Sequence, residues 1–114
     1  MNLEVADFKT IGETSLRQSE HRLAKEKDSC EEFNREVARL EAQTVQLYGF
    51  AALAAKREPD IDRTAQLWEV MVGVCEAFAR YIGELSKKHP HCPVTFDRIL
   101  DIRNRCQKMK DLHR

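Results

Sequence analysis

The chain has 114 residues, of which 42% are hydrophobic, 33% charged and 7% aromatic, with four glycines and three prolines. This composition is typical of one helical domain and excludes a sheet protein, which needs turn residues every few positions. The 19 basic and 19 acidic residues cancel, so no overall charge attracts nucleic acid or an anionic membrane.

The start of the sequence lacks the basic and apolar regions of a secretory signal. No apolar run reaches the roughly 20 residues that a membrane-spanning helix needs. We therefore expect a cytoplasmic protein without a membrane partner. In the cytoplasm its four cysteines should be thiols, and their spacing contains no Cys-x-x-Cys pair.

Residues 1–13 fit neither helical nor strand periodicity, and Gly12 closes the segment. We predict an N-terminal arm or a short helix that lies on a single helical-bundle domain formed by residues 14–114.

One long helix is predicted over about residues 15–57, because apolar residues recur there with a heptad rhythm and proline is absent. Ser15 followed by Gln18 resembles a capping box at its start. A second such pattern, Ser29 followed by Glu32, leaves open a break near Ser29, which would give four helices in place of three. A continuous helix would be about 65 Å long at 1.5 Å per residue.

A second helix is predicted over 61–88, with Asp60 at its start and a wide apolar face. The short connection at 58–60 predicts that it folds back antiparallel on the first helix with coiled-coil-like packing. In this register residue i lies near residue 118 − i, so that Leu40 meets Phe78 and Leu47 meets Met71.

Residues 15–29 would then project beyond the second helix, without cover from the rest of the chain. They can pair with a second chain, fold back together with residues 1–13, or remain a solvated single helix. For the first outcome, the predicted interface consists of Leu16, Leu23, Ala24 and Lys27. The expected partner is another copy of the chain, as a homodimer, or another helical protein.

A proline-stiffened turn at 89–93 leads to a third helix over about 95–112, for which Thr95 is a candidate cap. This helix is locally basic, and its predicted basic face carries Arg98, Arg105 and Lys108. Such a face can contact phosphate or an acidic protein surface. A solvated helix face with favourable cations near its C-terminus explains it better, because the total charge is neutral.

The strongest candidate for chemistry is the turn His89-Pro90-His91-Cys92. The predicted register places Cys30 beside it, and imidazole and thiolate are the usual zinc ligands. The predicted metal site is therefore Cys30, His89, His91 and Cys92, with zinc as the candidate ion. The alternative for the same cysteines is a regulatory disulfide, which requires that their Cα atoms lie within about 7 Å.

No nucleophile–base arrangement and no glycine-rich phosphate loop is evident, so the sequence favours a non-enzymatic protein without catalytic residues. We expect an all-α protein, a long helical hairpin with a third helix, that acts in interaction or assembly and self-associates through its first helix. The alternatives are a small metal-binding or redox-responsive protein centred on Cys30, His89, His91 and Cys92, and a regulatory nucleic-acid binder that uses the basic face.

Overall fold

The computed structural model describes residues 3–25 and 30–113, and these residues form helices without strands. The helices are α1 (Val5–Lys25), α2 (Cys30–Arg57), α3 (Ile61–Lys88) and α4 (Asp97–Leu112). The prediction of an all-α protein is confirmed.

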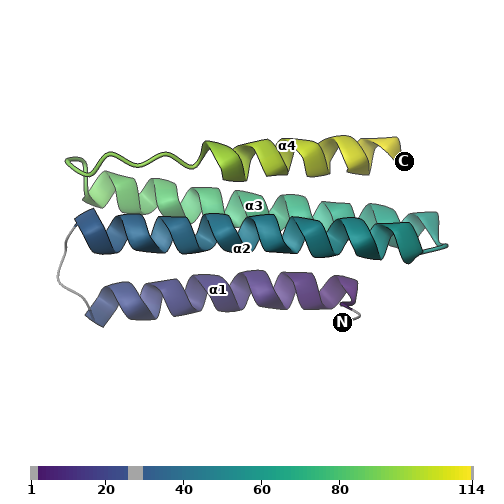
Figure 1. Ribbon diagram of the computed structural model, residues 1–114, viewed down its shortest axis with the longest axis horizontal. Coiled ribbons are helices and arrows are strands. Elements are labelled where there is room, and N and C mark those ends of the chain that lie inside the picture. The colour runs from purple at the N-terminus through teal and green to yellow at the C-terminus, as the bar shows by residue number, and fades with distance from the viewer. Residues whose placement is uncertain (1–2, 26–29, 114) are drawn as a thin grey trace.

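The helices α2 and α3 run antiparallel in the middle of the molecule, and α1 and α4 lie on opposite sides of this pair (Figure 1). Both outer helices contact α2 and α3. The long axis of the molecule measures 48 Å, which is shorter than the roughly 65 Å of a continuous helix over residues 15–57.

The prediction of one helix over 15–57 is therefore wrong for the described residues. α1 runs back along α2 and α3, so it does not project beyond them (Figure 1). Whether the chain breaks at Ser29 itself lies outside the described residues. The fold-back that we weighed as an alternative matches the observed course of α1.

α1 also begins earlier than expected, at Val5, and passes through Gly12 and Ser15. The backbone N–H of Glu4 donates to the carboxylate of Asp7 at 2.8 Å, which satisfies one of the free N–H groups at the start of the helix. Phe8 in the second turn is fully buried. Burial of this side chain holds residues 5–13 in the helix, so Ser15 is not a helix cap.

Packing of α1 on α3 depends on a close approach at Gly12. A Cβ atom at this position would lie 2.9 Å from Cγ2 of Val74. Because glycine has no side chain, the backbone of α1 comes closer to α3 than any other residue would allow.

The helix α3, predicted as the second helix, begins as expected. The carboxylate of Asp60 accepts hydrogen bonds from the backbone N–H groups of Asp62 and Arg63. The fourth helix differs, because α4 begins at Asp97 with Phe96 as its N-cap and without a side-chain cap. The prediction of Thr95 as the cap is wrong.

One hydrophobic core runs through the molecule, and its largest fully buried apolar side chains come from all four helices. They are Phe8, Phe33, Leu47, Trp68, Met71, Phe78, Ile82 and Ile99. The predicted register, in which residue i of α2 lies near residue 118 − i of α3, stays a prediction.

Candidate functional site: a disulfide at one end of the helices

The start of α2 and the loop between α3 and α4 meet at one end of the molecule. Cys30, the first residue of α2, and Cys92, in the loop, form a disulfide with a Cα–Cα distance of 5.3 Å. They are joined because α3 ends where the antiparallel α2 begins, and because the N–H of Cys92 donates to the carbonyl of His89 at 3.0 Å and turns the loop back. The expectation that all four cysteines are thiols is wrong for this pair.

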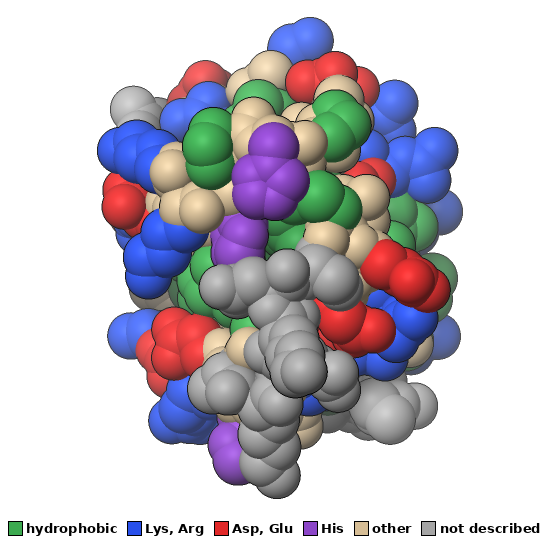
Figure 2. All heavy atoms as spheres, turned by 90° about the vertical axis from the view of Figure 1, so that its left-hand side faces the viewer, with side chains coloured by type: hydrophobic (Ala, Val, Ile, Leu, Met, Phe, Trp, Pro, Cys, Tyr) green, Lys and Arg blue, Asp and Glu red, His purple; other side chains and the backbone are tan. Residues whose placement is uncertain are grey.

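The two sulfurs differ in their surroundings. The Cys92 side chain is 5% exposed, whereas Cys30 is half-buried. His91 is exposed, and its imidazole and the two sulfurs offer donor atoms that all lie within 4.8 Å of one another. Figure 2 looks at this end of the molecule, where histidine side chains lie at the surface among hydrophobic ones.

His89 lies apart from this group of donors. Its ring centroid is 5.4 Å from that of Phe33 and 6.4 Å from that of His91. Its backbone N–H closes the end of α3 by donating to the carbonyls of Leu85 and Ser86. Of the four predicted metal ligands, the structure thus brings Cys30, His91 and Cys92 together and places His89 against the aromatic core.

The other two cysteines form a buried thiol pair between α3 and α4. Cys75 and Cys106 are both 0% exposed and are not disulfide-bonded. The hydrogen bond with Cys75, together with burial, raises the pKa of the Cys106 thiol. Cys106 therefore stays protonated at neutral pH.

An ion pair to the buried carboxylate of Glu36, which we did not predict, holds α1 against α2. The guanidinium of Arg22 on α1 donates to the Glu36 carboxylate at 2.9 and 3.1 Å, and Arg39 pairs with the same carboxylate. Burial acts to raise the pKa of Glu36, but the hydrogen bonds from Arg22 and the charges of Arg22 and Arg39 outweigh it and leave the pKa below its ordinary value. Beside this pair the hydroxyls of Ser19 and Tyr81 lie 3.0 Å apart, in hydrogen-bond contact between α1 and α3.

The predicted interface residues lie on α1 or beyond its end. Leu16 and Leu23 are half-buried, and Leu16 packs against the core. The side chain of Ala24 and the whole of Lys27 lie outside the part of the chain that the structure describes. The reason for predicting an uncovered extension is thus removed, because α1 rests on α2 and α3.

The predicted basic face lies on α4, where Arg98, Arg105 and Lys108 are exposed. Two neighbouring cations face α3 instead. Arg103 approaches Glu76 at 3.8 Å, and Lys110 approaches Glu69 at 3.9 Å. Part of the local excess of positive charge is therefore balanced within the fold.

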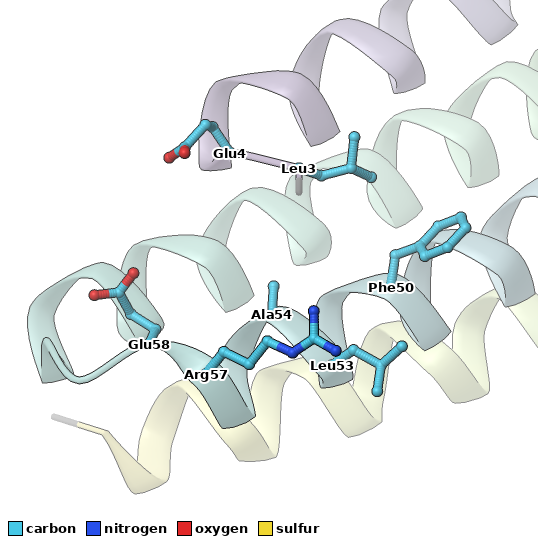
Figure 3. Close-up of a pocket in the computed structure, with 7 residues that line it drawn as sticks. All are labelled: Leu3, Glu4, Phe50, Leu53, Ala54, Arg57 and Glu58. Atoms are coloured by element: carbon cyan, nitrogen blue, oxygen red, sulfur yellow. The ribbon is translucent and has the colours of Figure 1, made fainter. Parts of the chain in front are cut away.

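A hollow of about 420 Å³ lies at the opposite end of the molecule, between the start of the chain and the end of α2. Figure 3 shows Phe50 and Ala54 of α2 pointing toward the segment that carries Leu3 and Glu4. Leu53, Arg57 and Glu58 complete its lining. This hollow lies far from the disulfide and holds none of the predicted site residues.

Among the described residues, none of the helices is both long and apolar enough to cross a membrane. No protein-family model, curated protein or solved structure matches this chain.

Proposed function

We propose that this is a redox-responsive helical protein in which Cys30 and Cys92 alternate between a disulfide and two thiols. The position of the bond carries this proposal. It joins the first residue of α2 to the loop that leads into α4, across 62 residues of sequence. Opening the bond removes the covalent link between that loop and α2, so the oxidation state changes how one end of the molecule is cross-linked.

The unequal exposure of the two sulfurs favours one direction of thiol–disulfide exchange. An attacking thiolate reaches the half-buried Cys30 more readily than the 5%-exposed Cys92. A bond forms between the attacking sulfur and Cys30, the Cys30–Cys92 bond breaks, and Cys92 leaves as a thiolate. A second thiol then displaces Cys30, so that two molecules of a small thiol are oxidised to one disulfide.

The remaining cysteines are suited to a passive role. Cys75 and Cys106 are buried in the α3–α4 interface and have no access to a soluble oxidant. The protonated state of Cys106 further lowers its reactivity, because the thiolate is the nucleophile.

Equilibration in glutathione buffers of graded potential tests this proposal. We expect one two-electron transition. After alkylation of free thiols, peptide mass spectrometry should show Cys30 and Cys92 either both protected or both modified, and Cys75 and Cys106 unmodified. A pair that becomes reduced only below about −300 mV would be a permanent structural cross-link and would contradict the switch. The Cys30→Ser/Cys92→Ser variant provides the background signal.

A second candidate function is self-association into a homodimer through α1. An apolar groove of about 360 Å³ lies between α1 and α3, and Leu16, one of the predicted interface residues, lines it with Val70, Val74 and Phe78. A second copy would cover this groove with its own α1.

Sedimentation velocity over a range of concentrations tests self-association. A dimer that forms through this groove is expected to dissociate in Leu16→Glu and to persist in Leu53→Glu, a control residue that is 51% exposed on α2 and lies outside the groove. A strict monomer at high micromolar concentration would exclude the homodimer.

A further inference from the structure

We propose that the reduced form of this site binds one zinc ion through Cys30, Cys92 and His91. The disulfide-bonded form and the zinc-bound form would then be two alternative states of Cys30 and Cys92. This inference rests on the proposed redox function, since the two sulfurs are available to a metal only after the disulfide opens.

The spacing of the three donors favours zinc once the sulfurs are separate. Zinc lies about 2.3 Å from sulfur and about 2.0 Å from nitrogen, so a tetrahedral ion keeps its donors roughly 3.3–3.8 Å apart. The three donor atoms already lie within 4.8 Å of one another. Reduction frees the two sulfurs to move apart, and we expect side-chain rotation of Cys30 and Cys92 to bring the three donors to tetrahedral spacing.

The local structure around the three ligands keeps them close together without the disulfide. His91 and Cys92 are adjacent, and the backbone hydrogen bond from Cys92 to His89 holds the turn that presents them. Cys30 is fixed by α2, whose first turns are anchored in the core by the buried Phe33. The contacts that position the donors are therefore separate from the bond that oxidation forms.

The charges of the donors also suit the ion. Two thiolates and a neutral imidazole balance the two positive charges of zinc, so a half-buried site carries no net charge. Cys30 stands at the N-terminus of α2, where the helix dipole favours a negatively charged ligand. A water molecule supplies the fourth ligand, because His91 is exposed and this side of the site faces solvent.

Oxidation releases the metal in a balanced reaction with a peroxide, which we name as the oxidant. The two thiolate sulfurs each lose one electron and form the S–S bond. Hydrogen peroxide accepts both electrons and two protons, its O–O bond breaks, and two water molecules form. The zinc ion leaves with its charge unchanged, since a disulfide is a poor ligand for it.

Native mass spectrometry and a zinc titration against a chelating dye test the inference. The reduced protein is expected to bind one zinc ion per chain. After treatment with peroxide it should be free of zinc and lighter by two hydrogen atoms than the metal-free reduced protein. Cobalt in place of zinc should give thiolate charge-transfer absorption in the near ultraviolet. Zinc that remains bound to the disulfide form would overturn the proposal.

Two matched histidine variants test which imidazole binds the ion. His91→Ala should weaken zinc binding more than about 100-fold, since loss of an outer partner alone costs about 10–100-fold. His89→Ala should weaken it less than about tenfold, because this ring lies on Phe33 and apart from the donors. Equal losses in the two variants, with circular dichroism showing that both are folded, would overturn the assignment of three protein ligands.

Failure of this inference is distinguishable from failure of the redox function. A reduced protein that binds no zinc but cycles between thiols and disulfide in glutathione buffer would refute only the metal site. A protein that binds zinc through His91 but never forms the disulfide under peroxide would refute the switch, and with it the claim that the two states alternate.

Discussion

Single side chains decide how α1 attaches to the other helices. Glu36 is 2% exposed, and its partner Arg22 reaches it from α1. A buried carboxylate that loses its partner is costly, whereas the pair as a whole contributes little more than an apolar contact. Arg39 pairs with Glu36 from within α2, whereas Arg22 connects the same carboxylate to α1.

Replacement of Arg22 by Met should lower the free energy of unfolding at pH 7 by about 1–3 kcal/mol, because Glu36 loses two charge-assisted hydrogen bonds and keeps its pairing with Arg39. Urea unfolding measures this. Arg35→Met is the matched control, because Arg35 pairs within α2 with Glu31, which is 80% exposed, and with Glu32, which is 21% exposed. This control should change stability by less than about 0.5 kcal/mol.

The Arg22–Glu36 pair makes the free energy of unfolding depend on pH. Because the pKa of Glu36 is lowered by folding, its contribution is fully present above the ordinary carboxylate pKa of about 4.3 and is lost as the pH falls through the lowered value. The difference in stability between wild type and Arg22→Met should therefore shrink as the pH falls from 7 toward 2. A difference that stays constant over this range would show that the ion pair does not contribute.

Gly12 provides a second test at the level of one residue. Gly12→Ala should destabilise the protein by about 1–3 kcal/mol, because the new Cβ would meet both methyl groups of Val74 at 2.9 and 3.0 Å. Gly49→Ala is the control, since nothing lies within 4 Å of its added Cβ, and it should stabilise α2 by roughly 0.5–1 kcal/mol. Thermal unfolding of both variants gives the comparison, and a stabilised Gly12→Ala would contradict the close approach of α1 to α3.

At the level of whole helices, the disulfide connects elements that the chain order keeps apart. It closes a loop of 62 residues that contains most of α2 and all of α3. Within this loop the helices also hold one another through the apolar core, so the bond adds to an existing arrangement.

Reduction of the disulfide should lower the free energy of unfolding by about 4 kcal/mol, the chain-entropy contribution of a loop of this length. Denaturant unfolding with and without a phosphine reductant measures the difference. The Cys30→Ser/Cys92→Ser variant should show no response to the reductant. A response of the same size in this variant would assign the effect to Cys75 and Cys106.

For the molecule as a whole, the direction of α1 is the property that most affects its shape. With α1 folded back, the radius of gyration is 15.0 Å and the longest dimension is 48 Å. Small-angle X-ray scattering of the monomer should give a radius of gyration within about 2 Å of this value, as expected for a packed domain of this length. A maximum dimension above roughly 65 Å would instead indicate a continuous helix through residues 15–57.

Part of the fold and of the candidate site could be predicted from local patterns. The apolar stripe of α3, the cap at Asp60 and the proximity of Cys30 to Cys92 follow from helical periodicity and a short connection. The extent of α1 could not be predicted, because residues 1–13 carry no clear period and their helix is held by burial of Phe8 and by the approach of Gly12 to Val74. The pairing of Arg22 with Glu36 was hidden for a similar reason, since charged residues on a helix are normally solvated.

By itself, the sequence determined that the protein is all-α, where α2 and α3 meet, and which residues at the turn carry thiol and imidazole chemistry. These properties depend on periodicity and on residue type, which are local. Only the tertiary structure decided that α1 returns along α2 and α3, that Cys30 and Cys92 are bonded, and that His89 lies on Phe33 while His91 lies with the sulfurs. These depend on which buried surfaces fit together in space, and that fit involves residues too far apart in the chain for a pattern to reveal.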